Sequence, residues 1–208
     1  SDPNKGISMS GPSVLIVSGL DPERCSPDIL FTLFGVYGDV LRVKILYNKK
    51  DTALVQLVNP QQAEIAVNHL NNCPLHGKTL QVNFSRHNSI SLPRAGSEQE
   101  SSHLTKDYTG SPLHRYKVAG SKNFQHITAP SPVLHLSNLP QNATEELITE
   151  IFNQYGNVAS FKFFEKDKRM SLVQMENLSD AVECLVMLHN YRIGDTNIRV
   201  SFSQKPIQ

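Results

Sequence analysis

The 208-residue sequence has few cysteines, almost no net charge and no long apolar run. A formal net charge of +1 excludes a protein that holds nucleic acid by bulk positive charge alone. No apolar run approaches the roughly 18 residues of a membrane-spanning helix, so we expect no membrane partner. Cys25, Cys73 and Cys184 lie far apart and form no CxxC pair. Their spacing argues against a disulfide framework or a zinc site and favours a reducing compartment.

Catalytic patterns are missing as well. The sequence holds 8 histidines and many serines. None belongs to a nucleophile turn with histidine and aspartate partners, to an HExxH pair or to a glycine-rich loop that follows a strand. We therefore predict a protein that is not an enzyme and that needs no metal or cofactor.

What the sequence does contain is an internal repeat with an offset of 118 residues. The matched pairs include Phe34 with Phe152, Gly38 with Gly156, Val55 with Val173, Leu70 with Leu188 and Phe84 with Phe202. Only Leu15–Leu20 (LIVSGL) needs an offset one residue larger to meet Leu134–Leu139 (LHLSNL). The repeat predicts two domains of one kind, at 13–93 and 131–208, each about 70 to 80 residues long.

Each copy shows the same order of secondary-structure signals. A short apolar run comes first, and then a helix with apolar spacing i, i+3, i+4, as at Leu30, Leu33 and Phe34. Two strands, a second helix and a last alternating strand follow. The order βαββαβ predicts an α+β fold, two ferredoxin-like sandwiches in which one sheet face packs on two helices and the other faces water.

The segment between the domains, 94–130, is rich in Ser, Pro, Gly and His and is predicted to be a linker. It carries large apolar groups such as Leu104, Tyr108 and Ile127, which a solvated tether would not need. We therefore expect part of it to dock on the domains. Residues 1–12 are predicted to be a disordered N-terminal segment, whose opening residues indicate a cloning remnant.

Strand alternation assigns side chains to the two sheet faces. The inward set is predicted to be Val43, Ile45, Ala53, Val55, Val82 and Phe84, and Phe161, Phe163, Val173, Val200 and Phe202. Apolar groups in the middle of an open face suit flat bases, and Lys or Arg at its edge suits phosphates. The candidate RNA-binding residues of the first domain are Ile16, Ser18, Lys44, Leu46, Tyr47, Lys50, Thr52, Leu54, Asn83, Ser85, Arg86 and His87. Those of the second are His135, Ser137, Lys162, Phe164, Met170, Leu172, Arg199, Ser201, Ser203, Gln204 and Lys205.

Both copies resemble RNA-recognition motifs. LIVSGL and LHLSNL match the family's hexamer, and Lys50–Leu57 (KDTALVQL) and Lys168–Met175 (KRMSLVQM) occupy the place of its octamer. The positions that are usually aromatic hold Ile16, Thr52 and Leu54 in one copy and His135, Met170 and Leu172 in the other. Because only His135 has a ring, we expect modest stacking, with base identity recognised by hydrogen bonds at the sheet edge.

The chain is similar to the C-terminal pair, the third and fourth motifs, of the polypyrimidine tract-binding protein family. The resemblance lies in Leu33–Val40 (LFGVYGDV), Leu104–Tyr108 (LTKDY), Gly120–Gln125 (GSKNFQ), Phe161–Phe164 (FKFF) and Arg199–Ser203 (RVSFS). It implies a monomeric reader of single-stranded, pyrimidine-rich (U/C) RNA that regulates pre-mRNA splicing and RNA processing. It also implies upstream motifs, a nuclear location with cytoplasmic shuttling open, and an added strand in the first domain. We place that strand at Asn88–Leu92, beside the second strand and toward Tyr47.

Surplus apolar residues on the helices predict a second interface. The candidate interdomain residues are Ile29, Phe31 and Val36 on the first helix, Leu113, Tyr116 and Phe124 in the linker, and Val182 and Val186 on the last helix. In the resembling family the helical faces pack together, which would hold the two sheets back to back. The alternative is a protein-interaction module that uses its helical faces for co-regulators and binds RNA weakly. The Arg-x-Phe signature of such modules is absent from Pro74–Gly77 and Tyr191–Gly194.

Overall fold

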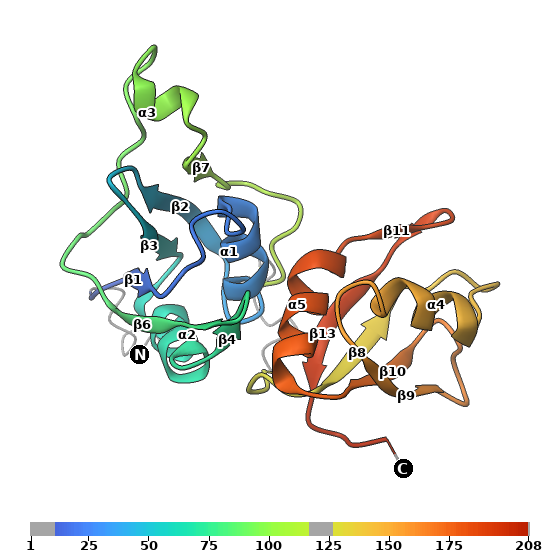
Figure 1. Ribbon diagram of the computed structural model, residues 1–208. Helices are drawn as coiled ribbons and strands as arrows, with labels where there is room; N and C mark the ends of the chain where they lie inside the picture. The colour runs from blue at the N-terminus through green and yellow to red at the C-terminus, as the bar shows by residue number, and fades with distance from the viewer. Residues whose placement is uncertain (1–10, 117–126, 208) are drawn as a thin grey trace, which may run out of the picture. The chain divides into compact units, whose positions relative to one another are not determined.

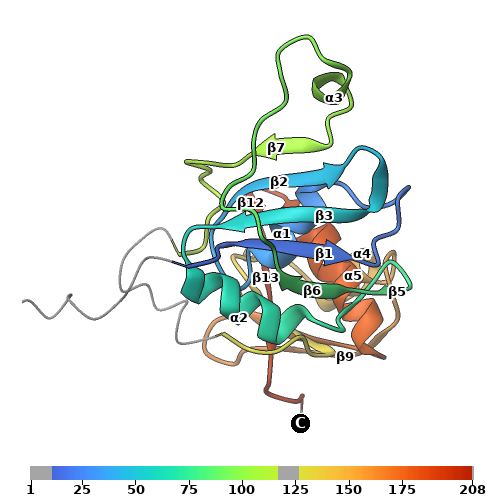
Figure 2. The same ribbon diagram turned by 90° about the vertical axis from the view of Figure 1, so that its left-hand side faces the viewer.

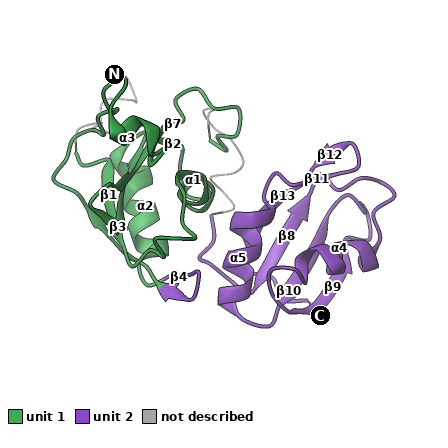
Figure 3. Cartoon of the chain, turned by 45° about the horizontal axis from the view of Figure 1, so that its top comes forward, with its two compact units in different colours: residues 1–72, 79–126 green, residues 73–78, 127–208 purple. Residues whose placement is uncertain are grey.

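The computed structural model describes residues 11–116 and 127–207. The chain divides into two compact units, one formed by residues 1–72 and 79–126 and the other by residues 73–78 and 127–208 (Figure 3). Most of the predicted N-terminal segment and Phe124 lie outside the described residues.

The first unit contains a five-stranded antiparallel sheet with the strand order β6-β1-β3-β2-β7 (Figure 1). Its elements are β1 (Val14–Ser18), α1 (Pro27–Phe34), β2 (Val40–Leu46), β3 (Lys49–Leu57), α2 (Pro60–Leu70), β6 (Gln81–Phe84), α3 (Glu98–Ser101) and β7 (Thr105–Asp107). The hairpin of β4 (Pro74–Leu75) and β5 (Lys78–Thr79) lies between α2 and β6 in the sequence.

The second unit repeats this order with a four-stranded sheet, β13-β8-β10-β9. Its elements are β8 (Val133–Ser137), α4 (Glu145–Phe152), β9 (Val158–Phe163), β10 (Ser171–Met175), α5 (Leu178–Leu188), β11 (Arg192–Ile193), β12 (Thr196–Asn197) and β13 (Arg199–Ser203). The βαββαβ order and the added strand of the first sheet confirm the predicted fold class.

Local sequence chemistry explains where the helices begin. The side chains of Ser26, Asn59, Thr144 and Asn177 each accept a hydrogen bond from the backbone N–H three residues later. Proline occupies the first helical position of α1 and α2, where its missing N–H costs nothing. The apolar faces that follow are buried: Leu30, Leu33 and Phe34 on α1, and Ile148, Ile151 and Phe152 on α4.

The repeat extends to the junction between the helices and the second strand of each motif. A Cβ on Gly38 would lie 2.7 Å from the Gln62 side chain, and one on Gly156 would lie 2.5 Å from that of Asp180. The backbone N–H after each glycine donates to the same side chain, at 2.8 Å in the first unit and 2.9 Å in the second. Only glycine leaves room for this contact, so both copies keep it.

The added strand of the first sheet is not the segment that we predicted. β7 pairs with β2, with Asp107 opposite Arg42 and Thr105 opposite Lys44. Asn88–Leu92 forms no strand, so that placement was wrong. The reason is that side chains of the open sheet face, not the backbone of β2, hold this segment: Arg42 donates to the Ile90 carbonyl at 2.7 Å.

The inward assignment of Phe84 is correct, but this side chain is far less buried than its neighbours on the same face. Phe84 pairs with Leu15 and so belongs to the face that bears the buried Val82, yet 44% of its surface is exposed. It is the last residue of an edge strand, where little lies beside it. Its counterpart Phe202 is 4% exposed.

Candidate nucleic-acid interface

Each open sheet face carries a row of four side chains across its strands. In the first unit the paired positions run Asn83, Ile16, Leu54 and Lys44. In the second they run Ser201, His135, Leu172 and Lys162. All eight are among the predicted RNA-binding residues, and the two rows are equivalent in the repeat. Each row places a polar group at one end and a lysine at the other.

The middle of the first row is covered by the chain itself. Ile90 forms a buried cluster with Val14 and Leu54, against which Leu46 packs. Its backbone N–H donates to the Gln56 side chain at 3.0 Å. As a result, Leu54 is only 6% exposed and offers little surface to a base.

Thr52, a neighbour of Leu54 on β3, is only 3% exposed, and its hydroxyl donates to Asp51 at 3.0 Å. Two of the three predicted contacts on β3, Thr52 and Leu54, are therefore inaccessible, whereas Lys50 is exposed. Ile16 and Tyr47 remain open, each at 37% exposure.

The second row borders a pocket of about 540 Å³. It is lined by Lys162, Phe164, Met170 and Leu172 of the sheet and by the C-terminal Lys205–Ile207, among others. The rings of His135 and Phe164 meet edge to face, with centroids 5.4 Å apart and planes inclined by 80°. Leu172 itself is 8% exposed. The pocket thus joins apolar and aromatic walls to three lysines, Lys162, Lys166 and Lys205, and two acidic residues.

The same turn follows the last strand of both sheets. The backbone N–H of His87 donates to the Ser85 hydroxyl, and that of Lys205 to the Ser203 hydroxyl, both at 3.1 Å. The other predicted edge residues are half-buried or exposed: Ser18, Ser137, Arg86, Arg199 and Gln204. The turn brings the polar groups that follow each last strand to the sheet margin.

Sequence reasoning missed a second hollow in the first unit. It measures about 520 Å³ and is lined by Lys44 and Tyr47 together with Ser91–Arg94 and Ser97–Gln99. The Lys50 ammonium lies 5.7 Å from the centre of the Tyr47 ring. In Figure 2 the segment with α3 extends beyond β7. The sequence analysis directed Asn88–Leu92 toward Tyr47, but as a strand, and it did not predict a hollow there.

Other chemistry finds little support in the described part of the chain. There, no group of three or more His, Cys, Asp or Glu could hold a metal ion. Burial raises the pKa of the Cys25, Cys73 and Cys184 thiols to about 12, so all three stay protonated and unreactive. Among the described helices, none is long and apolar enough to cross a membrane.

Three predicted interdomain residues, Phe31, Val36 and Tyr116, have partners within the first unit. The Phe31 ring stacks on Tyr108 at 4.2 Å, and the Val36 carbonyl accepts from the Tyr116 hydroxyl. Leu113 is 44% exposed. Ile29 is half-buried, whereas Val182 and Val186 are buried. The packing of the two helical faces stays a prediction.

Comparison with known families agrees with this geometry. The family models "RNA recognition motif (RRM, RBD or RNP domain)" and "RNA recognition motif" match residues 2–111 and 134–199. The chain therefore belongs to the RNA recognition motif family, whose domains bind RNA and are not enzymes. It is 41% identical over 191 residues to polypyrimidine tract-binding protein homolog 3 of Arabidopsis thaliana. Together with the two motifs, this places it in the polypyrimidine tract-binding protein family.

That match covers 91% of this chain and 42% of the Arabidopsis protein. Among solved structures, the Sxl-lethal protein/RNA complex is 19% identical, with 93% of this chain and 100% of that one covered and a TM-score of 0.34. The first two RRM domains of yeast poly(U)-binding protein Pub1 are 18% identical, with coverage of 92% and 99% and a TM-score of 0.33.

Proposed function

We propose that the chain binds single-stranded, pyrimidine-rich RNA through its two open sheet faces. The observation that carries this proposal is the pair of equivalent cross-strand rows. Each ends in a lysine, Lys44 or Lys162, that suits a phosphate, and in a small polar group, Asn83 or Ser201, that suits a base edge. Solvation of the surface alone would not require the same kinds of polar and basic groups at equivalent positions of both copies.

The open sheet faces favour small bases that are recognised by hydrogen bonds. Of the six usual stacking positions only that of His135 holds a ring, so stacking energy is modest. The groups after each last strand, such as Arg86 and Gln204, supply donors and acceptors at the margin. A pyrimidine presents O2, N3 and its 4-substituent within a small outline, whereas a purine would clash or leave buried donors unpaired.

Basic side chains at the sheet edges would hold the phosphates. Lys44, Lys50, Lys162 and Arg199 lie on or beside the two faces in a chain whose net charge is only +1. Few phosphates are neutralised in this arrangement, so the affinity should fall gently with salt. A steep dependence would indicate charge attraction alone.

The cellular role follows from the family. The Arabidopsis relative is a polypyrimidine tract-binding protein homologue, and the chain resembles the third and fourth motifs of that family. We infer a regulator of pre-mRNA splicing and RNA processing that acts in the nucleus. Regulation of splicing is a narrower role than RNA binding, which defines the RNA recognition motif family.

The test is a titration of the full chain followed by amide chemical shifts. One oligonucleotide alternates uracil and cytosine, and a second of equal length alternates adenine and guanine. We expect shifts along both rows and at least about tenfold weaker binding of the purine strand. Lys44→Ala and Lys162→Ala should weaken binding, whereas Lys78→Ala, exposed on β5, should not.

Two results would overturn the proposal. Equal affinity for the two strands would remove base selection. Shifts confined to the helices would instead favour a protein-interaction module. Repeating the titration at two salt concentrations separates base reading from charge attraction.

A further inference from the structure

The outer edge of the second sheet lacks a neighbour that the first sheet has. In the first unit, β7 pairs with β2 and closes that edge. The counterpart of β2 is β9, which ends the second sheet, and no described strand pairs with its outer side. Exposed strand edges of this kind are templates for a further strand.

In the first unit the added strand is held by backbone and side chains together. The Ile45 N–H donates to the Leu104 carbonyl at 2.8 Å, and the Tyr108 N–H donates to the Leu41 carbonyl at 2.7 Å. Lys106 and Tyr108 alternate along the strand, and both reach the same oxygen of Asp28 on α1.

The distances from Asp28 Oδ1 are 2.8 Å to the Lys106 ammonium and 2.6 Å to the Tyr108 hydroxyl. The Tyr108 ring also stacks on Phe31. Lys106 and Tyr108, a basic and an aromatic residue two positions apart, therefore bind β7 to α1.

The second unit leaves the equivalent apolar residues partly uncovered. Val43 and Ile45 of β2, next to β7, are 0% and 2% exposed. Their counterparts Phe161 and Phe163 are larger, stack edge to face at 4.8 Å, and are only half-buried. Two aromatic side chains at an open sheet edge leave apolar surface that a further strand would cover.

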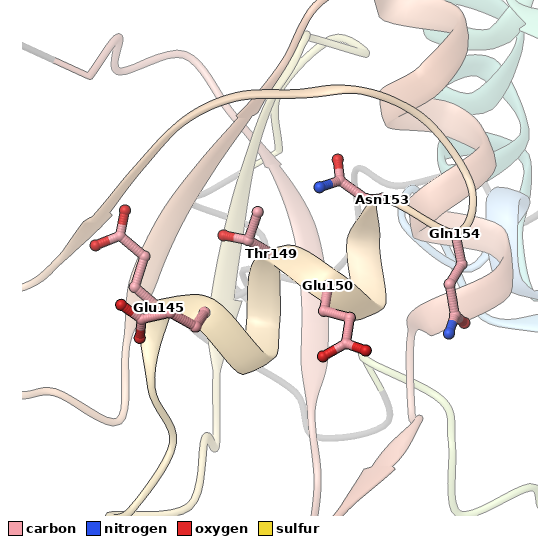
Figure 4. A pocket seen from close by; sticks show the side chains of 6 residues that line it. Glu145, Thr149, Glu150, Asn153 and Gln154 are labelled. Carbon is pink, nitrogen blue, oxygen red and sulfur yellow. The ribbon is translucent and has the colours of Figure 1, made fainter.

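Beside this edge, α4 lines a pocket at the positions equivalent to those where α1 of the first unit contacts β7. A pocket of about 680 Å³ on α4 is lined by Glu145, Glu146, Thr149, Glu150, Asn153 and Gln154. Figure 4 shows Glu145, Thr149 and Glu150 extending from this helix. In the repeat, Glu146 takes the place of Asp28, and Thr149 that of Phe31.

The negative charge of this pocket indicates which kind of strand would bind there. The carboxylate that receives Lys106 in the first unit is kept as Glu146, with Glu145 and Glu150 also on the pocket wall. No basic residue lies in the last turn of α4. A strand that docks here should therefore carry Lys or Arg on the side that faces α4.

We propose that β9 and α4 form a docking site for an extended peptide segment of a partner protein that presents a Lys or Arg side chain to α4. The segment adds to β9 as a fifth strand, as β7 does to β2. Its Lys or Arg lies opposite Phe161 and reaches Glu146, as Lys106 lies opposite Val43. An apolar residue two positions earlier lies beside Phe163, as Leu104 lies beside Ile45. An aromatic residue two positions later lies beside Thr149, as Tyr108 lies beside Phe31. Because Thr149 offers less contact than Phe31, the complex should be weak and separable.

The test uses the chain's own docking strand as the probe. A capped peptide with the sequence HLTKDYTG, residues 103–110, is titrated into the full chain. The edge of β2 is already occupied by its own β7, so of these two equivalent edges β9 is the one to which no described strand pairs. We expect amide shifts confined to β9 and α4, with a Kd of about 1 mM or tighter.

Matched variants make the result decisive. Glu146→Lys should weaken the peptide at least about tenfold, whereas Asp195→Lys, with the same charge change outside the pocket, should leave it unchanged. A peptide with Glu in place of Lys106 should not bind. Absence of shifts, shifts centred on β8 and β13 instead of β9 and α4, an equal loss in Asp195→Lys or self-association of the chain through β9 would each overturn the proposal. RNA titration is a separate readout, because the peptide takes the outer edge of β9 and RNA takes the open face, to which β9 contributes Lys162.

Discussion

The rings of Phe31 and Tyr108 stack with their centroids 4.2 Å apart and their planes inclined by only 19°. Phe31 belongs to α1, while Tyr108 directly follows β7. The contact joins a segment of the predicted linker to the helical layer of the first unit.

Phe31→Thr, which copies Thr149 of the second unit, should free β7. The variant loses the stack and the burial of Phe31, which is 8% exposed. Hydrogen exchange should show lost protection at Thr105–Asp107, with little change in the second unit. Tyr108→Phe, which keeps the ring and loses only the bond to Asp28, should retain most of that protection. Full protection in Phe31→Thr would contradict this account.

Acid should loosen the same docking. Partial burial raises the pKa of Asp28, but hydrogen bonds from Lys106 and Tyr108 outweigh burial and hold that pKa below its ordinary value. The ionised carboxylate therefore stabilises the docked strand above about pH 4. This stabilisation is lost as the pH falls through the lowered pKa. Amide shifts of β7 followed from neutral to acidic pH should report the release.

The neighbouring Asp107 also has a lowered pKa, chiefly because of hydrogen bonds from Thr109. Asp107→Asn is therefore the control for the acid experiment. Asp28→Asn should abolish most of the acid response, whereas Asp107→Asn should preserve it. An unchanged response in Asp28→Asn would assign the effect to another group.

Ser171 is fully buried, and its hydroxyl has no hydrogen-bond partner within the part of the chain that the structure describes. The equivalent position of the first unit holds Ala53, which is also fully buried. Ser171→Ala should therefore stabilise the second unit by up to about 1 kcal/mol, because it removes an unsatisfied polar group. The reverse change, Ala53→Ser, should destabilise the first unit by about 1 to 3 kcal/mol. Urea unfolding of both variants checks the pair, and destabilisation by Ser171→Ala would reveal a partner for the hydroxyl.

His135 is the one ring at the usual stacking positions of either face. His135→Ala should weaken pyrimidine RNA at least about fivefold, since base stacking on a side-chain ring contributes about 1 to 3 kcal/mol. Ile16→His, which places the same ring on the first face, should strengthen binding there. Titration of both variants with the same oligonucleotide tests the assignment. Equal affinities of wild type and His135→Ala would show that the ring is not used.

The repeat made most of the fold predictable. Pairs such as Gly38 with Gly156 fixed the register, and apolar periodicity then gave the element order. The identity of the fifth strand was not accessible in this way. The alternation at Asn88–Leu92 and the short run at Thr105–Asp107 are both compatible with a strand. Only the side-chain partners of Ile90 and Tyr108 decide between them.

For the candidate site, alternation predicted which side chains lie on the open sheet faces but not which of them are accessible. Alternation assigns Thr52 and Leu54 to the open side of β3 correctly, because it depends on the local pleat. It cannot show that Ile90, 36 positions after Leu54, returns to cover that side. The hollow beside Tyr47 depends on loop geometry in the same way, and no periodic signal marks it.

The cover formed by Ile90 has a consequence for how the first motif engages a strand of nucleotides. A base seated over Leu54 would have to evict Ile90 and re-expose a side chain that is now 1% accessible. Occupancy of the two flanks, Ile16 with Asn83 on one side and Lys44 with Tyr47 on the other, avoids that loss. The first motif should then bind nucleotides at two separate sites, one on each side of Ile90. The nucleotide that connects these two sites should tolerate any base.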